Sequence, residues 1–150
     1  MFAPSHMAVG ALIDAHIKGR AAVALIAVAS HAALDITVFW HAPYKWPDDT
    51  PAIFKVIPYP HDLASALVVA VLVVATLLVG FLLRRYWWGM LWGISPDIVD
   101  WGLLRPITGH PVIHNFFHKV STPWGFGVEM LFIALVTLLV LRGFRKAGWL

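Results

Sequence analysis

Cysteine is absent from this chain of 150 residues, and this absence restricts the chemistry that the chain can perform. Without thiolates there is no disulfide framework and no cysteine-based metal site. Any metal must therefore be held by imidazole and carboxylate groups, a donor set that suits zinc, manganese, iron or nickel. The 8 histidines and the 8 aspartates and glutamates are the residues that supply such donors.

Charged residues are also scarce, at 13% of the chain, whereas hydrophobic residues make up 60%. This apolar share exceeds that of an ordinary soluble domain, and the length suits a single transmembrane domain over 1–150. The formal net charge is +3, but the basic residues lie at the ends of apolar segments. Their placement predicts how the loops are oriented across a membrane. We expect no nucleic-acid partner. The N-terminus has no basic region before its apolar run, so we expect no removable signal peptide.

Five apolar segments predict an all-α integral membrane protein, a bundle of four to five transmembrane helices plus a short interfacial or re-entrant helix. The third segment carries no charge over 21 residues and, at about 1.5 Å per residue, spans a hydrocarbon core of about 30 Å. The first segment is the shortest and is the one expected to be re-entrant or surface-lying. The segments cover residues 5–17, 21–40, 63–83, 86–104 and 124–141.

The placement of lysine and arginine predicts the orientation of these segments. If all five span, seven basic residues share one side and four lie on the other. The positive-inside rule then places the turns at 18–20 and 84–85, together with the C-terminus, in the cytoplasm. The N-terminus and the long polar loops, 41–60 and 105–122, are expected outside the cell membrane.

An ionisable pair inside the second segment is the clearest functional signal. His31 and Asp35 are four residues apart and therefore share one helical face. Ionisable side chains at membrane depth are costly and usually functional. The pair can ligate one metal, or Asp35 can orient His31 without binding the metal itself. The alternative is a structural pair that is hydrogen-bonded at a polar point of the core.

Asp97 and Asp100 form a second cluster in the fourth segment. Ser95 as an N-cap and Pro96 as the first helical residue would explain Asp97, because acidic groups are favourable at a helix N-terminus. That interpretation leaves Asp100 unexplained. Two carboxylates within a membrane segment need cations to stay ionised, and a divalent metal would supply the charge.

Two more clusters lie at the outer side of the predicted topology. His114 and His118 are four residues apart, the spacing of paired zinc-binding histidines, although an amphipathic helix at the membrane surface explains them as well. In the other cluster, Asp62 is interpreted as the N-cap of the third helix, and His61 is a candidate ligand or general acid. All four clusters therefore converge on one half of the membrane.

Two of these elements resemble a known family. The stretches Ser-His-Ala-Ala-Leu-Asp at 30–35 and Pro-Asp-Ile-Val-Asp at 96–100 are similar to the Ser-His-x-x-x-Asp and Pro-Asp-x-Asp-His elements of the small membrane-bound metal-dependent hydrolases. The order of the elements differs, the aspartates are one residue further apart, and Trp101 stands where the family has histidine. The resemblance implies a metal site and a hydrolase activity.

These residues together predict a metal-dependent membrane hydrolase that acts on an amphiphilic lipid or isoprenoid phosphate or ester. The expected metal is zinc, with manganese or iron as alternatives, and a lipid bilayer is the expected partner. His61 and Glu129 are the candidates for proton transfer. The candidate metal ligands are His6, His31, Asp35, Asp97, Asp100, His114 and His118.

The same side chains also suit a transporter or binding protein for protons or metal ions. A transport path must continue to the cytoplasmic side, where Asp14 and His16 are the only candidates to extend it. A b-type haem protein is a third possibility, in which His31 faces a second histidine, but the neighbouring aspartates do not favour haem.

Overall fold

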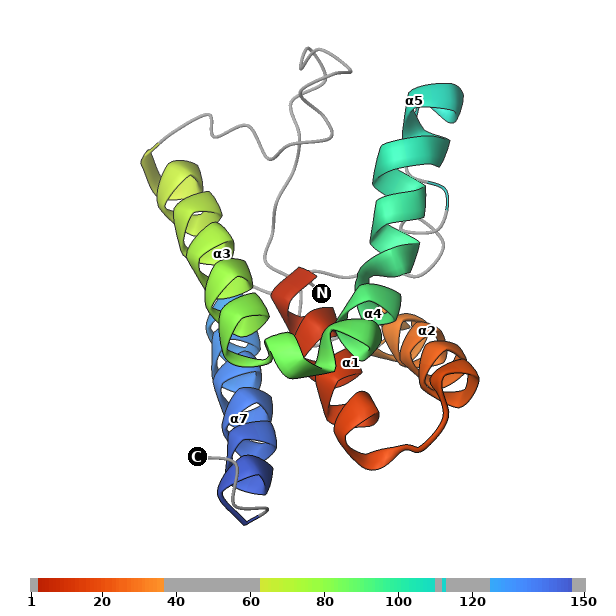
Figure 1. The fold of residues 1–150 in the computed structure, drawn as a ribbon. Helices are drawn as coiled ribbons and strands as arrows, with labels where there is room; N and C mark the ends of the chain where they lie inside the picture. Colours follow the sequence, from red (N-terminus) through yellow and green to blue (C-terminus); the bar gives the residue numbers. More distant parts are fainter. Residues whose placement is uncertain (1–2, 37–62, 110–111, 113–124, 147–150) are drawn as a thin grey trace.

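The computed structural model describes residues 3–36, 63–109, 112 and 125–146, and within these ranges the regular structure is entirely helical (Figure 1). The prediction of an all-α fold is confirmed for this part of the chain. Its elements are α1 (Ala3–His16), α2 (Arg20–Ile36), α3 (Leu63–Leu82), the 3₁₀ turn η1 (Arg84–Tyr86), α4 (Trp87–Val99), the π-helical turn η2 (Asp100–Leu104), α5 (Arg105–Thr108) and α7 (Gly125–Lys146).

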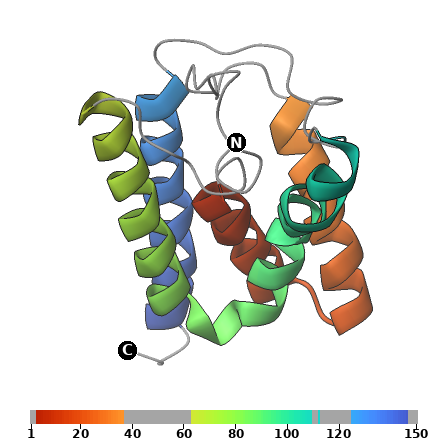
Figure 2. The ribbon, with the colours of Figure 1, turned by 90° about the horizontal axis from the view of Figure 1, so that it is seen from above.

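The short helix α1 is the centre of the fold. It contacts α2, α3, α4 and α7, and the two views show it between the α3–α7 pair on one side and α2 with α4 on the other (Figures 1 and 2). A helix that is enclosed on several sides must carry small or apolar residues around most of its circumference. This packing does not favour the alternative in which the segment lies on a membrane surface, and its placement in a membrane stays a prediction. Its buried residues are Pro4, Ser5, His6, Met7, Ala8, Gly10 and Ala11.

Helices α1 and α4 cross in backbone contact at three glycines. A Cβ atom on Gly10 would overlap the carbonyl oxygen of Gly89, and a Cβ atom on Gly89 would overlap that of Gly10. One turn further along α4, a Cβ atom on Gly93 would overlap the carbonyl oxygen of His6. Gly89 and Gly93 are four residues apart, a spacing of small residues that allows two helices to approach closely. The crossing thus fixes α4 against the half of α1 that carries His6.

The turn between α1 and α2 is held against the start of α4. Gly19 has a φ of 96°, a left-handed conformation that glycine adopts without steric cost. Asp14 accepts the backbone N–H of Gly89 at 3.1 Å, and the indole N–H of Trp88 donates to the carbonyl oxygen of Arg20 at 3.0 Å. The predicted turn at 18–20 is therefore confirmed, and polar contacts join it to α4.

Helix α4 continues through Pro96, so the predicted N-cap role of Ser95 and the predicted break at this point are wrong. Pro96 has no N–H for the carbonyl of Trp92, and the Ser95 hydroxyl donates to that oxygen instead, at 2.9 Å. The helix changes its hydrogen bonding at Asp100, where the N–H of Arg105 donates to the carbonyl oxygen of Asp100 in the π-helical manner.

The other predicted segments agree with the helices within a few residues. α3 ends at Leu82 and the arginines that follow it form η1, as the third segment and its basic end predicted. α7 extends to Lys146, beyond the predicted end at 141. Of the second segment, residues 21–36 belong to α2, and the residues from 37 onward lie outside the described part.

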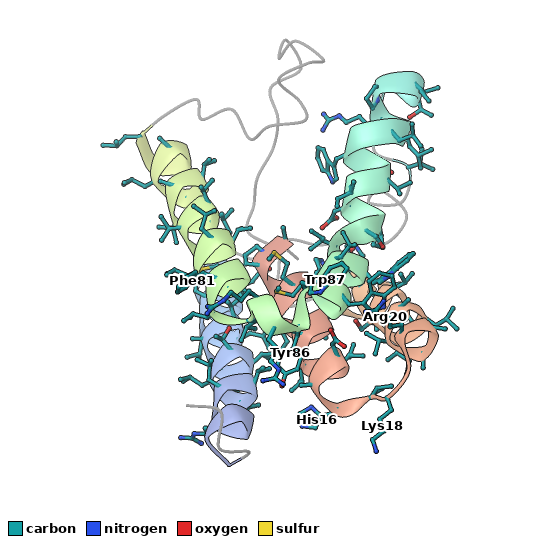
Figure 3. All side chains as sticks on the ribbon, in the orientation of Figure 1. His16, Lys18, Arg20, Phe81, Tyr86 and Trp87 are labelled. Carbon is teal, nitrogen blue, oxygen red and sulfur yellow. The ribbon has the colours of Figure 1, made fainter. Side chains whose placement is uncertain are left out.

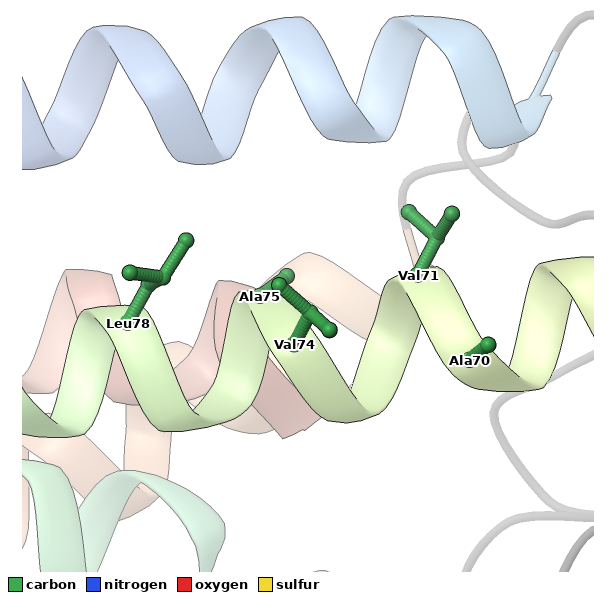
Figure 4. Close-up of a pocket in the computed structure, with 5 residues that line it drawn as sticks. All are labelled: Ala70, Val71, Val74, Ala75 and Leu78. Carbon is green, nitrogen blue, oxygen red and sulfur yellow. The ribbon is translucent and has the colours of Figure 1, made fainter.

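The outward faces of the helices are strongly apolar. Leu25 on α2, Leu77 on α3 and Leu131 on α7 are 74%, 67% and 71% exposed, and Phe81 and Trp87, which are labelled in Figure 3, are exposed as well. An open groove on α3 is lined only by apolar side chains, those of Ala70, Val71, Val74, Ala75 and Leu78 (Figure 4). The groove therefore includes none of the predicted site residues.

The described residues contain no single helix that is both long enough and apolar enough to cross a membrane. The stretches Ala66–Leu82 and Arg84–Thr108 together have the required length and composition, with a bend of 85° between them.

Candidate metal centre

Three helices bring ionisable side chains together at the centre of the fold. His6 comes from α1, His31 and Asp35 come from α2, and Asp97 comes from α4. One ligand atom from each of His6, His31 and Asp35 lies within 4.8 Å of the other two, an arrangement that could hold a metal ion. All three residues are at most 2% exposed. We call these three, with Asp97, the histidine–aspartate cluster.

The carboxylate of Asp35 lies between the two imidazole rings. Its Oδ1 is 3.2 Å from Nε2 of His6, and its Oδ2 is 3.1 Å from Nε2 of His31. The two rings are stacked, with centroids 3.7 Å apart and planes inclined by 20°. Asp97 adds a second carboxylate to His31, with Oδ1 3.5 Å from the same Nε2. The Nε2 atom of each histidine therefore lies within 3.2 Å of a carboxylate oxygen of Asp35.

Gly93 determines which nitrogen of His31 faces the carboxylates. Nδ1 of His31 is 2.8 Å from the carbonyl oxygen of Gly93. A carbonyl oxygen only accepts, so Nδ1–H donates, and a neutral ring then has its lone pair on Nε2. Metal-binding histidines are commonly oriented by a backbone carbonyl on the remote nitrogen in this way. The geometry therefore prepares Nε2 of His31 as a ligand atom.

Three of the four imidazole nitrogens in the cluster make no hydrogen bond within the part of the chain that the structure describes. Among the described residues, neither nitrogen of His6 nor Nε2 of His31 has a hydrogen-bond partner. Their contacts with Asp35 and Asp97 have ion-pair distances but not the alignment of a hydrogen bond. Buried polar groups are normally hydrogen-bonded, so such nitrogens require another partner. A divalent cation would accept the lone pair of each Nε2 and offset the negative charge of the carboxylates.

The separations between the facing atoms also suit metal ligands. With bonds of about 2.05 Å in a tetrahedral site, neighbouring ligand atoms are about 3.3 Å apart. The nitrogen–oxygen distances in the cluster are 3.1, 3.2 and 3.5 Å. The donors are imidazole and carboxylate, as the lack of cysteine requires. The residues present therefore fit a divalent metal.

Glu129 lies beside the segment that carries His6. It is fully buried on α7, and it accepts the hydroxyl of Ser5 at 2.5 Å. A distance this short is typical of a hydroxyl that donates to an ionised carboxylate. The contact joins α7 to α1 at the residue that precedes His6. The predicted role of Glu129 in proton transfer stays a prediction.

Asp100 is buried at the start of the π-helical turn and is not a member of the group formed by His6, His31 and Asp35. Arg105 is buried five residues further along, and its guanidinium lies 4.4 Å from the centroid of the Trp101 ring. The role of Asp100 as a metal ligand stays a prediction.

The two candidates for a transport path have local roles. Asp14 accepts the N–H of Gly89, and Nδ1 of His16 donates to the carbonyl oxygen of Leu12 at 2.9 Å. His16 is exposed at the C-terminal end of α1 (Figure 3). Neither residue belongs to the group of potential metal ligands around His31.

Several predicted site residues cannot be placed, because His61, His114 and His118 lie outside the described residues. Two positioning residues, Ser5 and Gly93, were not predicted from the sequence. For Gly93 a signal existed in its spacing of four from Gly89. Comparisons with known proteins supply no relative: no family model, curated protein or solved structure matches the chain.

Proposed function

We propose that the chain is a membrane-embedded, metal-dependent hydrolase whose metal centre is the histidine–aspartate cluster. The observation that carries this proposal is the set of buried imidazole nitrogens that face Asp35 without hydrogen bonds among the described residues. Zinc is the preferred metal, with manganese and iron as alternatives. When bound, such a metal lowers the pKa of a coordinated water toward about 7 and polarises the scissile bond.

The residues of the cluster have different roles in this proposal. His31 binds through Nε2 while the carbonyl of Gly93 holds its ring in place. The side chain of Asp97 is 17% exposed, whereas that of Asp35 is fully buried. Asp97 is therefore the carboxylate that an incoming water can reach. We assign to its second oxygen, Oδ2, the acceptance of a proton from the attacking water and the return of that proton to the leaving group.

A membrane is the proposed setting, with an amphiphilic phosphate or ester as the substrate. The exposed leucines and other large apolar side chains on α2, α3 and α7 support this, because soluble monomers rarely expose large apolar patches. The start of α2, the turn η1 and the end of α7 lie at one edge of the bundle (Figure 2). These ends carry Arg20, Arg84, Arg85 and Arg142, which fits a cytoplasmic side for this edge.

Transport of protons or metal ions is the alternative function. It would require a path from the cluster to the cytoplasmic end of α1. Asp14 and His16, the candidates for that path, instead serve as an acceptor for Gly89 and as a donor to the helix backbone. Their contacts support a hydrolase over a transporter.

Metal analysis of the detergent-purified protein tests the proposed centre. We expect bound zinc, manganese or iron in the wild type, less of it in His31→Ala, and its loss in Asp35→Ala. His16→Ala is the matched control, because it removes an exposed histidine of the same chain, and it should retain the metal. A wild-type protein that contains no metal and takes up none on reconstitution would overturn the proposal.

Membrane insertion and activity are tested separately. Extraction of cell membranes with alkaline carbonate should leave the chain in the pellet, and recovery in the supernatant would contradict an embedded location. Long-chain phosphate monoesters and carboxylic esters in mixed micelles should be hydrolysed by the wild type but not by His31→Ala. Equal rates for the two proteins would contradict the assigned centre.

A further inference from the structure

The stacking of His6 on His31 restricts how the cluster can bind metal. Both rings present Nε2 to the same carboxylate, but each faces a different oxygen of Asp35. The rings are nearly parallel, with centroids 3.7 Å apart. Their lone pairs therefore run side by side. The geometry of the imidazole ring limits the number of ions that such a pair can hold.

A single ion does not suit two stacked imidazoles. With a metal–nitrogen bond of about 2.05 Å, an ion in the ring plane lies about 3.2 Å from the ring centroid. Two rings bound to one tetrahedral ion would then have centroids about 5.2 Å apart. The observed separation of 3.7 Å would require a nitrogen–metal–nitrogen angle of only about 70°. It would also bring the two nitrogens into overlap.

We propose that the cluster holds two divalent ions, bridged by the carboxylate of Asp35. One ion lies between Nε2 of His6 and Oδ1 of Asp35, and the other lies among Nε2 of His31, Oδ2 of Asp35 and Oδ1 of Asp97. The inference rests on the proposed metal-dependent function. Side-by-side lone pairs place the ions about as far apart as the rings, and two-metal hydrolytic sites have ions about 3.5–4 Å apart.

The charge of such a centre indicates the class of substrate. Two ionised aspartates offset only half of the charge of two divalent ions, and both histidines are neutral when they bind metal. The centre therefore retains positive charge in a buried position, which favours an anionic group. Paired ions stabilise both the attacking and the leaving oxygen in displacement at phosphorus. Among amphiphilic substrates, a phosphate ester thus fits this site better than a carboxylic ester.

The number of metal ions per chain is the direct test. We expect two ions in the wild type and in the control His16→Ala. His6→Asn should retain one ion, because it removes a ligand of one ion only, whereas Asp35→Asn should lose both. Circular dichroism checks that each variant is folded. If His6→Asn is folded but retains two ions, the assignment of one ion to His6 is overturned.

A spectroscopic test needs no substitution. Wild-type protein loaded with manganese(II) should give the electron paramagnetic resonance spectrum of a spin-coupled pair, and added inorganic phosphate should change it. An isolated six-line manganese signal with one ion per chain would overturn the two-ion site and leave the proposed function standing. No bound metal would overturn both. A coupled pair that does not respond to phosphate would contradict the phosphate-ester assignment.

Discussion

The carbonyl oxygen of Gly93 accepts a hydrogen bond from Nδ1 of His31 at 2.8 Å, and the same residue leaves room for the backbone of His6. One glycine on α4 therefore positions both histidines of the cluster. Its carbonyl sets the ring of His31 on α2, and its missing side chain sets the distance to α1. The proposed metal centre depends in this way on how closely two helices approach.

Replacement of Gly93 by alanine should damage both the packing and the site. The new methyl group would overlap the carbonyl oxygen of His6, and overpacking of this kind typically costs about 1–3 kcal/mol. Displacement of the carbonyl from His31 should lower metal affinity about 10–100-fold. Denaturant unfolding in detergent and metal titration measure the two effects. Gly102→Ala is the control, because a Cβ atom there meets nothing within 4 Å, and it should leave metal affinity unchanged.

The hydrogen bond between Ser5 and Glu129 should make a measurable contribution to stability. Ser5→Ala should lower the free energy of unfolding by about 1.5–3 kcal/mol, since the bond reaches a buried carboxylate. In a Glu129→Gln background the same substitution should cost less, because the acceptor is then neutral. A double-mutant cycle measures the coupling. If Ser5→Ala costs the same in both backgrounds, the hydroxyl does not stabilise a charge on Glu129.

Asp14 should contribute to stability but not to metal binding. Its carboxylate accepts the N–H of Gly89 near the start of α4, as a helix cap does. Asp14→Ala should therefore cost about 0.5–2 kcal/mol, and Asp14→Asn should cost less because its amide oxygen still accepts. Thermal unfolding ranks the variants. Loss of bound metal from a folded Asp14→Ala protein would instead connect this end of α1 to the cluster and favour transport.

Removal of metal should lower stability through the cluster. A ligand that binds only the folded state stabilises it by about 4.1 kcal/mol at a free concentration of 1,000 Kd, so a chelator should lower the melting temperature. Re-addition of zinc should restore it. Asp35→Ala should melt at one temperature with or without chelator. A shift of equal size in Asp35→Ala would place the responsible metal elsewhere.

The local part of the site could be predicted from the sequence. His31 and Asp35 are four residues apart in a helix, and their shared face follows from helical periodicity alone. Asp97 lies beside this pair, with Oδ1 3.5 Å from Nε2 of His31, whereas the convergence of all four clusters stays a prediction. These residues can be recognised from their types and their spacing, without any knowledge of how the helices cross.

The rest of the site depends on tertiary contacts that local patterns do not contain. His6 is a lone histidine near the N-terminus with no partner nearby in the sequence, and α1 is central to the fold only because of the glycine crossing. Pro96 was expected to begin a helix, yet the Ser95 hydroxyl replaces the missing backbone donor and the helix continues. Likewise, the hydrogen bond of Gly93 to His31 joins residues that are 62 positions apart.

The π-helical turn at Asp100–Leu104 shifts the helical register between α4 and α5, which otherwise form one continuous helix. A π turn contains one residue more than the α-helical turn it replaces, so it changes the rotation of everything beyond it by about 100°. If the same residues instead formed a regular α-helix, Asp97 and the cluster would stay in place, whereas Arg105 and the chain after it would face a different direction. The turn thus separates the part of this helix that holds Asp97 from the part that sets the direction of the chain beyond Arg105.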